Sequence, residues 1–180
     1  ERHAAAIFHR IGIAGEQRAD AAVAACAERF DRARLTPGHF EVSAAEMAAG
    51  RQAVPAGLRR AIRQAHGQIR ACARRRVPWG WRETIRPGVK IGERFVPLDR
   101  VGVYVPGGTA PLVSTVLHTA TLASVAGVAE IVVATPPRPD GTVHPAILEA
   151  AACVGVTAVY RLGGVYAIGA LAFGTESIRP

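Results

Sequence analysis

The chain has 180 residues, of which 49% are apolar, and this length suits one folded domain or two small ones. The composition excludes a disordered chain, and no stretch approaches the ~18 uninterrupted apolar residues of a membrane span. The net charge of +8 is local, because residues 51–100 carry 13 basic and 3 acidic side chains while the stretches on either side are nearly neutral.

The start of the chain, Glu1-Arg2-His3, has neither the charged segment nor the apolar segment of a signal peptide. It also lacks Met, which indicates a processed or cut-down product. The three cysteines, Cys26, Cys72 and Cys153, are widely spaced and odd in number. This pattern is typical of small buried thiols in a reducing compartment, so we expect a cytoplasmic protein without a disulfide framework or a metal cluster.

Two helices are predicted in the first part of the chain, over residues 3–11 and 16–34, with Gly15 between them. In the second helix, apolar residues recur at three- and four-residue spacing, which predicts one buried face. The residues of this face are Ala22, Val23, Cys26, Ala27 and Phe30.

Two further helices are predicted between residues 43 and 76. Ser43 and Glu46, three residues apart, are typical of a capping box at the start of a short helix. Pro55 suits the first turn of a longer helix that reaches about Arg76. The predicted buried stripe of this longer helix is Leu58, Ile62, Ala65, Ile69 and Cys72.

The longer helix also carries seven arginines, most of them away from its apolar stripe. They are Arg59, Arg60, Arg63, Arg70, Arg74, Arg75 and Arg76. Three interpretations stay open for them: a solvated basic face, a contact with another subunit or domain, and a nucleic-acid surface. Aromatic side chains that stack on bases are not interleaved with these arginines, so nucleic acid is the least favoured partner.

A β-hairpin is predicted after the basic helix. Trp79-Gly80-Trp81 interrupts the helical pattern, and such tryptophans are more typical of a core plug or an interface anchor than of a ligand platform. Strands are expected over residues 83–85 and 89–91, joined by Arg86-Pro87-Gly88, where proline followed by glycine favours a type II turn. A further strand is expected over residues 94–98.

The stretch from Val101 to Gly127 is the most informative part of the chain. A β-branched strand, Val101–Val105, is followed by Pro106-Gly107-Gly108 and by a long apolar helix that ends at Gly127. A strand, a glycine turn and a helix in this order present backbone N–H groups to a bound ligand. This unit is therefore the first candidate for a binding site.

Two more strand–helix units are predicted after Gly127. They are a strand at 131–134 with a helix that starts at His144-Pro145, and a strand at 157–162 with a helix at 165–173. The alternation predicts an α/β fold: a partial Rossmann-like parallel sheet with helices on both faces, preceded by N-terminal helices and the hairpin. We expect residues 1–96 to form the helical and hairpin region and residues 97–180 the incomplete Rossmann-like region.

Both glycine pairs, Gly107-Gly108 and Gly163-Gly164, fall at the carboxyl ends of predicted strands, where open parallel sheets bind ligands. Glycine there lets the backbone approach a pyrophosphate or a ribose. Neither pair completes Gly-x-Gly-x-x-Gly, so simple tight turns are the alternative. Tyr104 and Tyr166, each beside a glycine pair, either flank an adenine or nicotinamide ring or are half-buried packing side chains.

No catalytic or metal-binding set is visible in the sequence. The histidines are scattered, without the spacing of metal ligands, and His118 is expected to pack within its apolar helix. No Ser-His-Asp or Cys-His set is legible, and no pair of carboxylates lies near the glycines. The residues therefore indicate one half of a site, which binds a ligand, without a catalytic half.

Several segments resemble the histidinol dehydrogenase family. The longest runs from Pro97 to Leu117 and contains Tyr104-Val105-Pro106-Gly107-Gly108. The others are residues 29–31, 61–69, 126–128, 131–137, 144–148 and 163–176. The resemblance covers nearly the whole chain and is most specific from residue 97 onward.

The resemblance implies a homodimeric enzyme that depends on zinc and NAD and oxidises L-histidinol to L-histidine, the last step of histidine biosynthesis. The cofactor-binding residues that it assigns are Tyr104, Pro106, Gly107, Gly108, Gly163, Gly164 and Tyr166. Tyr166 stands where the family has a glutamine that contacts NAD, and a phenol lacks the paired donor and acceptor of an amide.

The family's zinc ligands, its Glu-His catalytic pair and its substrate residues lie beyond the position that matches Pro180. The chain alone is therefore expected to be inactive, as a truncated part of a longer enzyme. Two alternatives stay open: a diverged nucleotide-binding module or pseudo-enzyme of the same fold, and a relative that oxidises another amino- or sulfo-alcohol.

Overall fold

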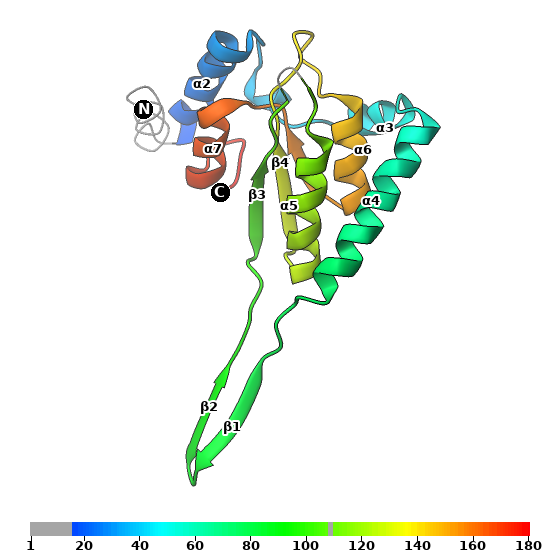
Figure 1. The fold of residues 1–180 in the computed structure, drawn as a ribbon. Helices are drawn as coiled ribbons and strands as arrows, with labels where there is room; N and C mark the ends of the chain where they lie inside the picture. Colours follow the sequence, from blue (N-terminus) through cyan, green and yellow to red (C-terminus); the bar gives the residue numbers. More distant parts are fainter. Residues whose placement is uncertain (1–15, 108–109) are drawn as a thin grey trace.

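The structure, a computed structural model, describes residues 16–107 and 110–180, so the helix predicted over 3–11 lies outside the described residues. Its centre is a parallel sheet of β3 (Arg100–Tyr104), β4 (Glu130–Ala134) and β5 (Ala158–Tyr160), in the order β3-β4-β5 (Figure 1). The parallel sheet predicted from the strand–helix alternation is confirmed.

Side chains alternate along these strands and give the sheet two apolar faces. One face is a row of valines in register, Val103, Val133 and Val159, covered by α5 (Val113–Ala126) and α6 (Pro145–Val154). On the other face, Val132 and Tyr160 share a core with α2 (Glu16–Cys26) and α7 (Gly164–Phe173). The helices predicted on both faces are therefore confirmed (Figure 1).

The N-terminal helices pack against this sheet assembly. α3 (Ala44–Gln52) contacts α6, and α4 (Ala56–Arg74) lies across α5 and α6. The capping box of α3 is confirmed: the Ser43 hydroxyl accepts from the Glu46 N–H at 3.2 Å, and the Ser43 N–H donates to the Glu46 carboxylate at 2.9 Å. Pro55 is the N-cap of α4 rather than a residue of its first turn. The division of the chain at residue 97 stays a prediction.

The helix predicted over 16–34 is too long. α2 ends at Cys26 and continues as a π-helical turn, η1 (Ala27–Asp31), and Arg32 then adopts a left-handed conformation with φ 56°. The wider i→i+5 turn departs from the 3.6-residue period on which the predicted face rests. Phe30 is accordingly 48% exposed, beneath the guanidinium of Arg29, instead of buried.

The stripe predicted on α4 is only partly buried. Ile62 is buried and Ala65 and Ile69 pack partly against the core, whereas Leu58 and Cys72 are exposed. α4 is an outer helix that packs against α5 and α6 with one side, so residues away from that side are exposed (Figure 1). None of the three cysteines forms a disulfide; Cys26 and Cys153 are partly buried, and the expectation of a buried thiol is wrong for Cys72, which is exposed.

The predicted hairpin is confirmed and forms an arm that projects from the body (Figure 1). Its strands, β1 (Trp81–Arg86) and β2 (Val89–Glu93), are antiparallel and longer than expected, and Gly88 has φ 79° in the turn. Trp79 is 87% exposed, so the role of core plug is wrong for this side chain. The strand predicted over residues 94–98 is wrong, because this segment connects the arm to β3 without pairing with any described strand.

The ends of the later helices follow local chemistry. His144 caps α6, its Nδ1 accepting from the Ala146 N–H at 3.2 Å, with Pro145 as the first helical residue, as predicted. Gly127 and Gly155 end α5 and α6 with φ 90° and 89°. His118 is exposed on α5, so the packing role expected for it is wrong. Within the described part of the chain, no helix combines the length and apolarity that a membrane span requires.

Candidate functional site

The candidate site lies at the carboxyl ends of the three parallel strands. Backbone pairing continues past the strand ends: the Val105 N–H donates to the Ala134 carbonyl at 2.8 Å, and the Thr135 N–H donates to the Tyr160 carbonyl at 3.0 Å. These bonds hold the segments that follow β3, β4 and β5 side by side. The two predicted glycine turns follow β3 and β5, and β4 lies between them.

Gly107 is required by the close approach of the segment after β4. A Cβ at this position would lie 2.8 Å from the Thr135 Oγ1 and 3.3 Å from Pro136. Its neighbour Pro106 is exposed, and Gly108 lies outside the described residues. α5 begins only at Val113, so the first glycine turn is not directly joined to a helix N-terminus as the sequence predicted.

Gly163 and Gly164 are required for two different reasons. Gly163 is buried, and a Cβ there would lie 2.5 Å from one carboxylate oxygen of Asp31 and 2.8 Å from the other. Gly164 is exposed and has φ 55°, the left-handed region that favours glycine. Gly163 is the N-cap of α7, so this turn is joined directly to the helix.

Tyr104 connects the end of β3 to the second glycine turn. It is the last residue of β3, its ring is half-buried, and its hydroxyl accepts a hydrogen bond from the Gly164 N–H at 3.0 Å. The phenol therefore reaches across the end of β4 to the start of α7. Residues that the sequence places 60 positions apart meet at this bond.

Tyr166 lies beneath the site rather than in its wall. The side chain is 1% exposed, and its hydroxyl accepts from the Gly163 N–H at 3.0 Å and donates to the Asp31 carboxylate. Burial and the bond to Asp31 both raise the pKa of this phenol. The predicted stacking of Tyr166 on a cofactor ring is wrong for this structure, because the ring has no free face.

Asp31 is a residue of the site that residue types and spacing do not reveal. It ends the π-helical turn η1, 135 positions from Tyr166, and only the resemblance of residues 29–31 to the family pointed to this stretch. Burial raises the pKa of the Asp31 carboxyl, and the hydrogen bonds from Tyr166 and from the Gly163 backbone oppose that rise. Asp31 is thus a partly buried acceptor directly behind the second glycine turn.

The described residues do not fit a zinc site. Over residues 16–107 and 110–180, no group of three or more His, Cys, Asp or Glu side chains is arranged to hold a metal ion. They do fit part of a nucleotide site at Gly164, where exposed backbone carries no side chain, whereas Thr135 and Asp31 fill the Cβ positions of Gly107 and Gly163. The exposed Gly164 offers the closest approach.

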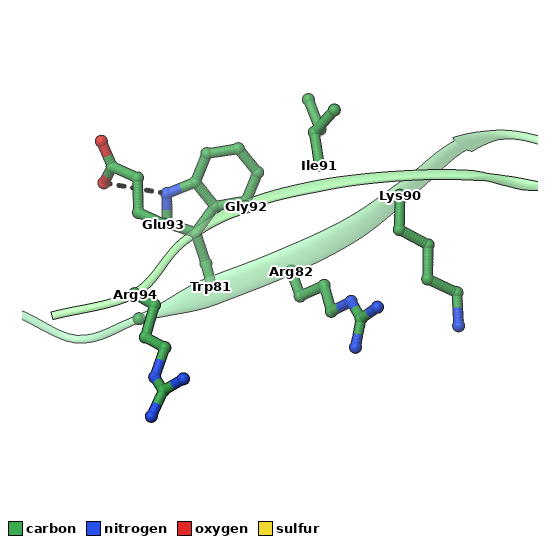
Figure 2. Close-up of a pocket in the computed structure, with 8 residues that line it drawn as sticks. Trp81, Arg82, Lys90, Ile91, Gly92, Glu93 and Arg94 are labelled. Carbon is green, nitrogen blue, oxygen red and sulfur yellow. Dashed lines mark hydrogen bonds between the residues drawn. The ribbon is translucent and has the colours of Figure 1, made fainter. Parts of the chain in front are cut away.

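Two cavities lie away from the glycine turns, along the arm and at its base. A shallow cavity of about 450 Å³ runs along the hairpin, where the Trp81 indole N–H donates to Glu93 at 3.1 Å (Figure 2). Trp81 and Ile91 project to one side of the hairpin, and Arg82, Lys90 and Arg94 project to the other (Figure 2). An apolar groove of about 510 Å³ at the base is lined by residues that include Phe95, Val96 and Leu122.

Comparison with known proteins agrees with the resemblance seen in the sequence. A family model described as histidinol dehydrogenase matches residues 2–180. A histidinol dehydrogenase of Synechococcus sp. is 46% identical over 176 residues, which are 98% of this chain and 41% of that protein. A histidinol dehydrogenase of Deinococcus radiodurans is 47% identical over 172 residues, which are 96% of this chain and 38% of that protein.

A solved structure gives the same result for the fold. The crystal structure of histidinol dehydrogenase from Elizabethkingia anophelis matches with a TM-score of 0.90 and 34% sequence identity, over 99% of this chain and 40% of that chain. The chain spans about two fifths of the length of these relatives. Since the family match covers nearly every residue and the fold agrees, the chain belongs to the histidinol dehydrogenase family.

Proposed function

We propose that this chain supplies one wall of the NAD site of a histidinol dehydrogenase that acts on L-histidinol as part of a longer enzyme. The observation that carries the proposal is the bond from the Gly164 N–H to the Tyr104 hydroxyl, because it joins the end of β3, just before the first glycine turn, to the second glycine turn. NAD, when bound, accepts the hydride that leaves the alcohol carbon. This chain's part is to bind and orient the cofactor.

In this proposal the cofactor contacts are Tyr104, Pro106, Gly107, Gly108 and Gly164, and the buried Gly163 and Tyr166 support the second turn from below. Tyr104 presents its phenol edge and Gly164 its exposed backbone. No step is assigned to zinc, because the described residues offer no ligand set for it. We propose that the chain alone has no turnover and that zinc and the substrate are held by parts of the full-length enzyme outside it.

A homodimer in the cytoplasm completes the proposal. The arm exposes Trp81, Ile85 and Ile91 on a two-stranded hairpin that is marginally stable by itself, and Trp79 is exposed on the connection to it. Apolar patches of this kind mark surfaces that meet other protein. Most arginines of α4 are exposed to solvent, and we do not propose that they bind nucleic acid.

Calorimetric titration with NAD tests the binding role, and an assay with L-histidinol, NAD and zinc tests the predicted inactivity. We expect saturable NAD binding and no turnover by the chain. Robust turnover would show that these residues contain the catalytic groups. Absence of NAD binding would contradict the proposed function.

A second candidate is a diverged nucleotide-binding module, favoured by Tyr166 in place of the family glutamine. The full-length protein separates the two. NAD binding together with oxidation of L-histidinol supports the dehydrogenase, whereas NAD binding without oxidation of any amino alcohol supports the module. Oxidation of a different amino- or sulfo-alcohol would identify a relative with another substrate.

A further inference from the structure

We propose that Asp31 is a positioning residue of the NAD site: through the Tyr166 hydroxyl, its carboxylate fixes the Gly163–Gly164 turn in the conformation that receives the cofactor. This inference rests on the proposed function, and it adds a residue and a physical role to it. In this arrangement the Tyr166 hydroxyl binds the turn from its buried side, and Asp31 fixes the position of that hydroxyl.

The first support is a continuous hydrogen-bond chain. The Gly163 N–H donates to the Tyr166 hydroxyl at 3.0 Å, and that hydroxyl donates to the Asp31 carboxylate. The Tyr166 oxygen thus accepts from the Gly163 N–H while the Tyr166 O–H donates to Asp31. The direction of the chain is set by Asp31, because an ionised carboxylate can only accept.

The second support is steric. The Asp31 carboxylate occupies the space where a Cβ of residue 163 would lie, with its two oxygens 2.5 Å and 2.8 Å from that position. The carboxylate therefore touches the turn directly as well as through Tyr166. Gly163 has φ −111° and ψ 173°, extended backbone that other residues adopt, so contact with Asp31 is the reason for glycine at this position.

The third support is that the two backbone amides of the turn have different hydrogen-bond partners. The Gly163 N–H is directed inward to Tyr166, and the Gly164 N–H is directed to Tyr104 at the edge of the site. Gly163 is buried and Gly164 is exposed. Fixing the inner amide therefore also fixes the exposed Gly164, whose N–H donates to Tyr104 and which is the part of the turn that a ligand can approach.

The experiment uses three variants of the whole chain: Tyr166→Phe, Asp31→Asn and the two combined. Tyr166→Phe keeps the ring and removes the hydroxyl, and Asp31→Asn keeps the size and removes the charge. The matched controls are Tyr160→Phe, on the same face of the sheet, and Asp140→Asn, on a surface loop. Two quantities are measured: the exchange rate of the Gly163 amide by NMR and the dissociation constant for NAD.

We expect each single variant to raise the exchange rate of the Gly163 amide about tenfold and to weaken NAD binding about fivefold, with the amides of Val133 and Val159 unchanged. The double variant should be no worse than the more damaging single variant, because both changes break one chain of bonds. The controls should stay within about twofold of the wild type. A purely structural role of Asp31 would lower the melting temperature without this non-additive effect on affinity.

Two results would overturn the inference: NAD affinity unchanged in both single variants while the wild type binds, and additive effects in the double variant. A wild type that does not bind NAD overturns the proposed function instead. In that case an unchanged Gly163 exchange rate in Tyr166→Phe and Asp31→Asn would also overturn the role of Asp31 in fixing the turn, and a tenfold increase would uphold it.

Discussion

The Tyr104 hydroxyl, at the end of β3, accepts a hydrogen bond from the Gly164 N–H at the start of α7, at a distance of 3.0 Å. This bond crosses the end of β4 and joins the end of β3, just before the first glycine turn, to the second glycine turn at the carboxyl edge of the sheet. The bond brings two strand–glycine segments, far apart in the sequence, together at one surface.

Tyr104→Phe tests the importance of this bond for binding. The variant keeps the ring and leaves the Gly164 N–H exposed to water, so the free energy of unfolding should change by less than about 1 kcal/mol. NAD affinity should fall about threefold to tenfold, which corresponds to the loss of one neutral hydrogen bond. Calorimetric titration measures the affinity, and an unchanged dissociation constant would show that the Tyr104 hydroxyl takes no part in binding.

Gly163→Ala tests the steric contact behind the second turn. Because the new Cβ would meet the Asp31 carboxylate, we expect the free energy of unfolding to fall by about 1–3 kcal/mol. Gly67→Ala is the control, since that position is in the middle of α4 with nothing within 4 Å of its Cβ. The control should gain about 0.5–1 kcal/mol. Equal effects in urea denaturation would contradict the contact with Asp31.

Glu46 gives the fold a defined dependence on pH. The Arg161 guanidinium, whose side chain is 7% exposed, donates to the Glu46 carboxylate at 2.7 Å and lowers the pKa of Glu46 from 4.5 to about 2. The folded-state pKa lies below the ordinary value, so this carboxylate stabilises the fold above pH 4.5 and loses that effect as the pH falls toward 2.

Glu46→Gln should therefore lower the melting temperature at pH 7, and the difference from the wild type should shrink between pH 4.5 and about 2. Arg161 also donates to the carbonyls of Glu41 and Gly141, so its charge keeps two partners in the variant. Glu93→Gln, on the exposed arm, is the control. A difference between Glu46→Gln and the wild type that is constant over this range would contradict the role of the ion pair.

Trp79 should contribute nothing to the stability of the body. Its side chain is 87% exposed on the connection to the arm, so Trp79→Ser should leave the free energy of unfolding within about 0.5 kcal/mol of the wild type. Val159 is fully buried in the row of valines on one face of the sheet, and Val159→Ala should lower the free energy of unfolding by roughly 2 kcal/mol. If Trp79→Ser destabilised the fold as much as Val159→Ala, the Trp79 side chain would have to be packed against other residues, which would contradict its exposure.

The strands and helices after residue 97 were predictable because their signals are local. A β-branched run such as Ile131–Val133 predicts a buried strand wherever it occurs, and His144-Pro145 and Gly155 mark the two ends of a helix by their own chemistry. The same holds for the capping box of Ser43 and Glu46. These elements needed no knowledge of distant contacts.

The elements that failed depend on contacts that the local pattern does not contain. The π-helical turn η1 removed Phe30 from the predicted buried face. Residues 94–98 have the composition of a strand but pair with no strand in the described part of the chain. Asp31 and Tyr166 meet across 135 positions, so the spacing of residues could not show that they form one hydrogen-bonded unit beneath the glycine turn.

An NMR titration of the isotopically labelled chain with NAD tests whether the cofactor binds at the glycine turns, because it reports which backbone amides the cofactor reaches. We expect saturable shifts concentrated at Tyr104, Gly107, Gly163 and Gly164, with amides of the arm unchanged. Binding of NAD at the glycine turns would be contradicted by shifts confined to the arm or to α4. It would also be contradicted by the absence of saturable shifts at NAD concentrations of several millimolar, above a dissociation constant of about 1 mM.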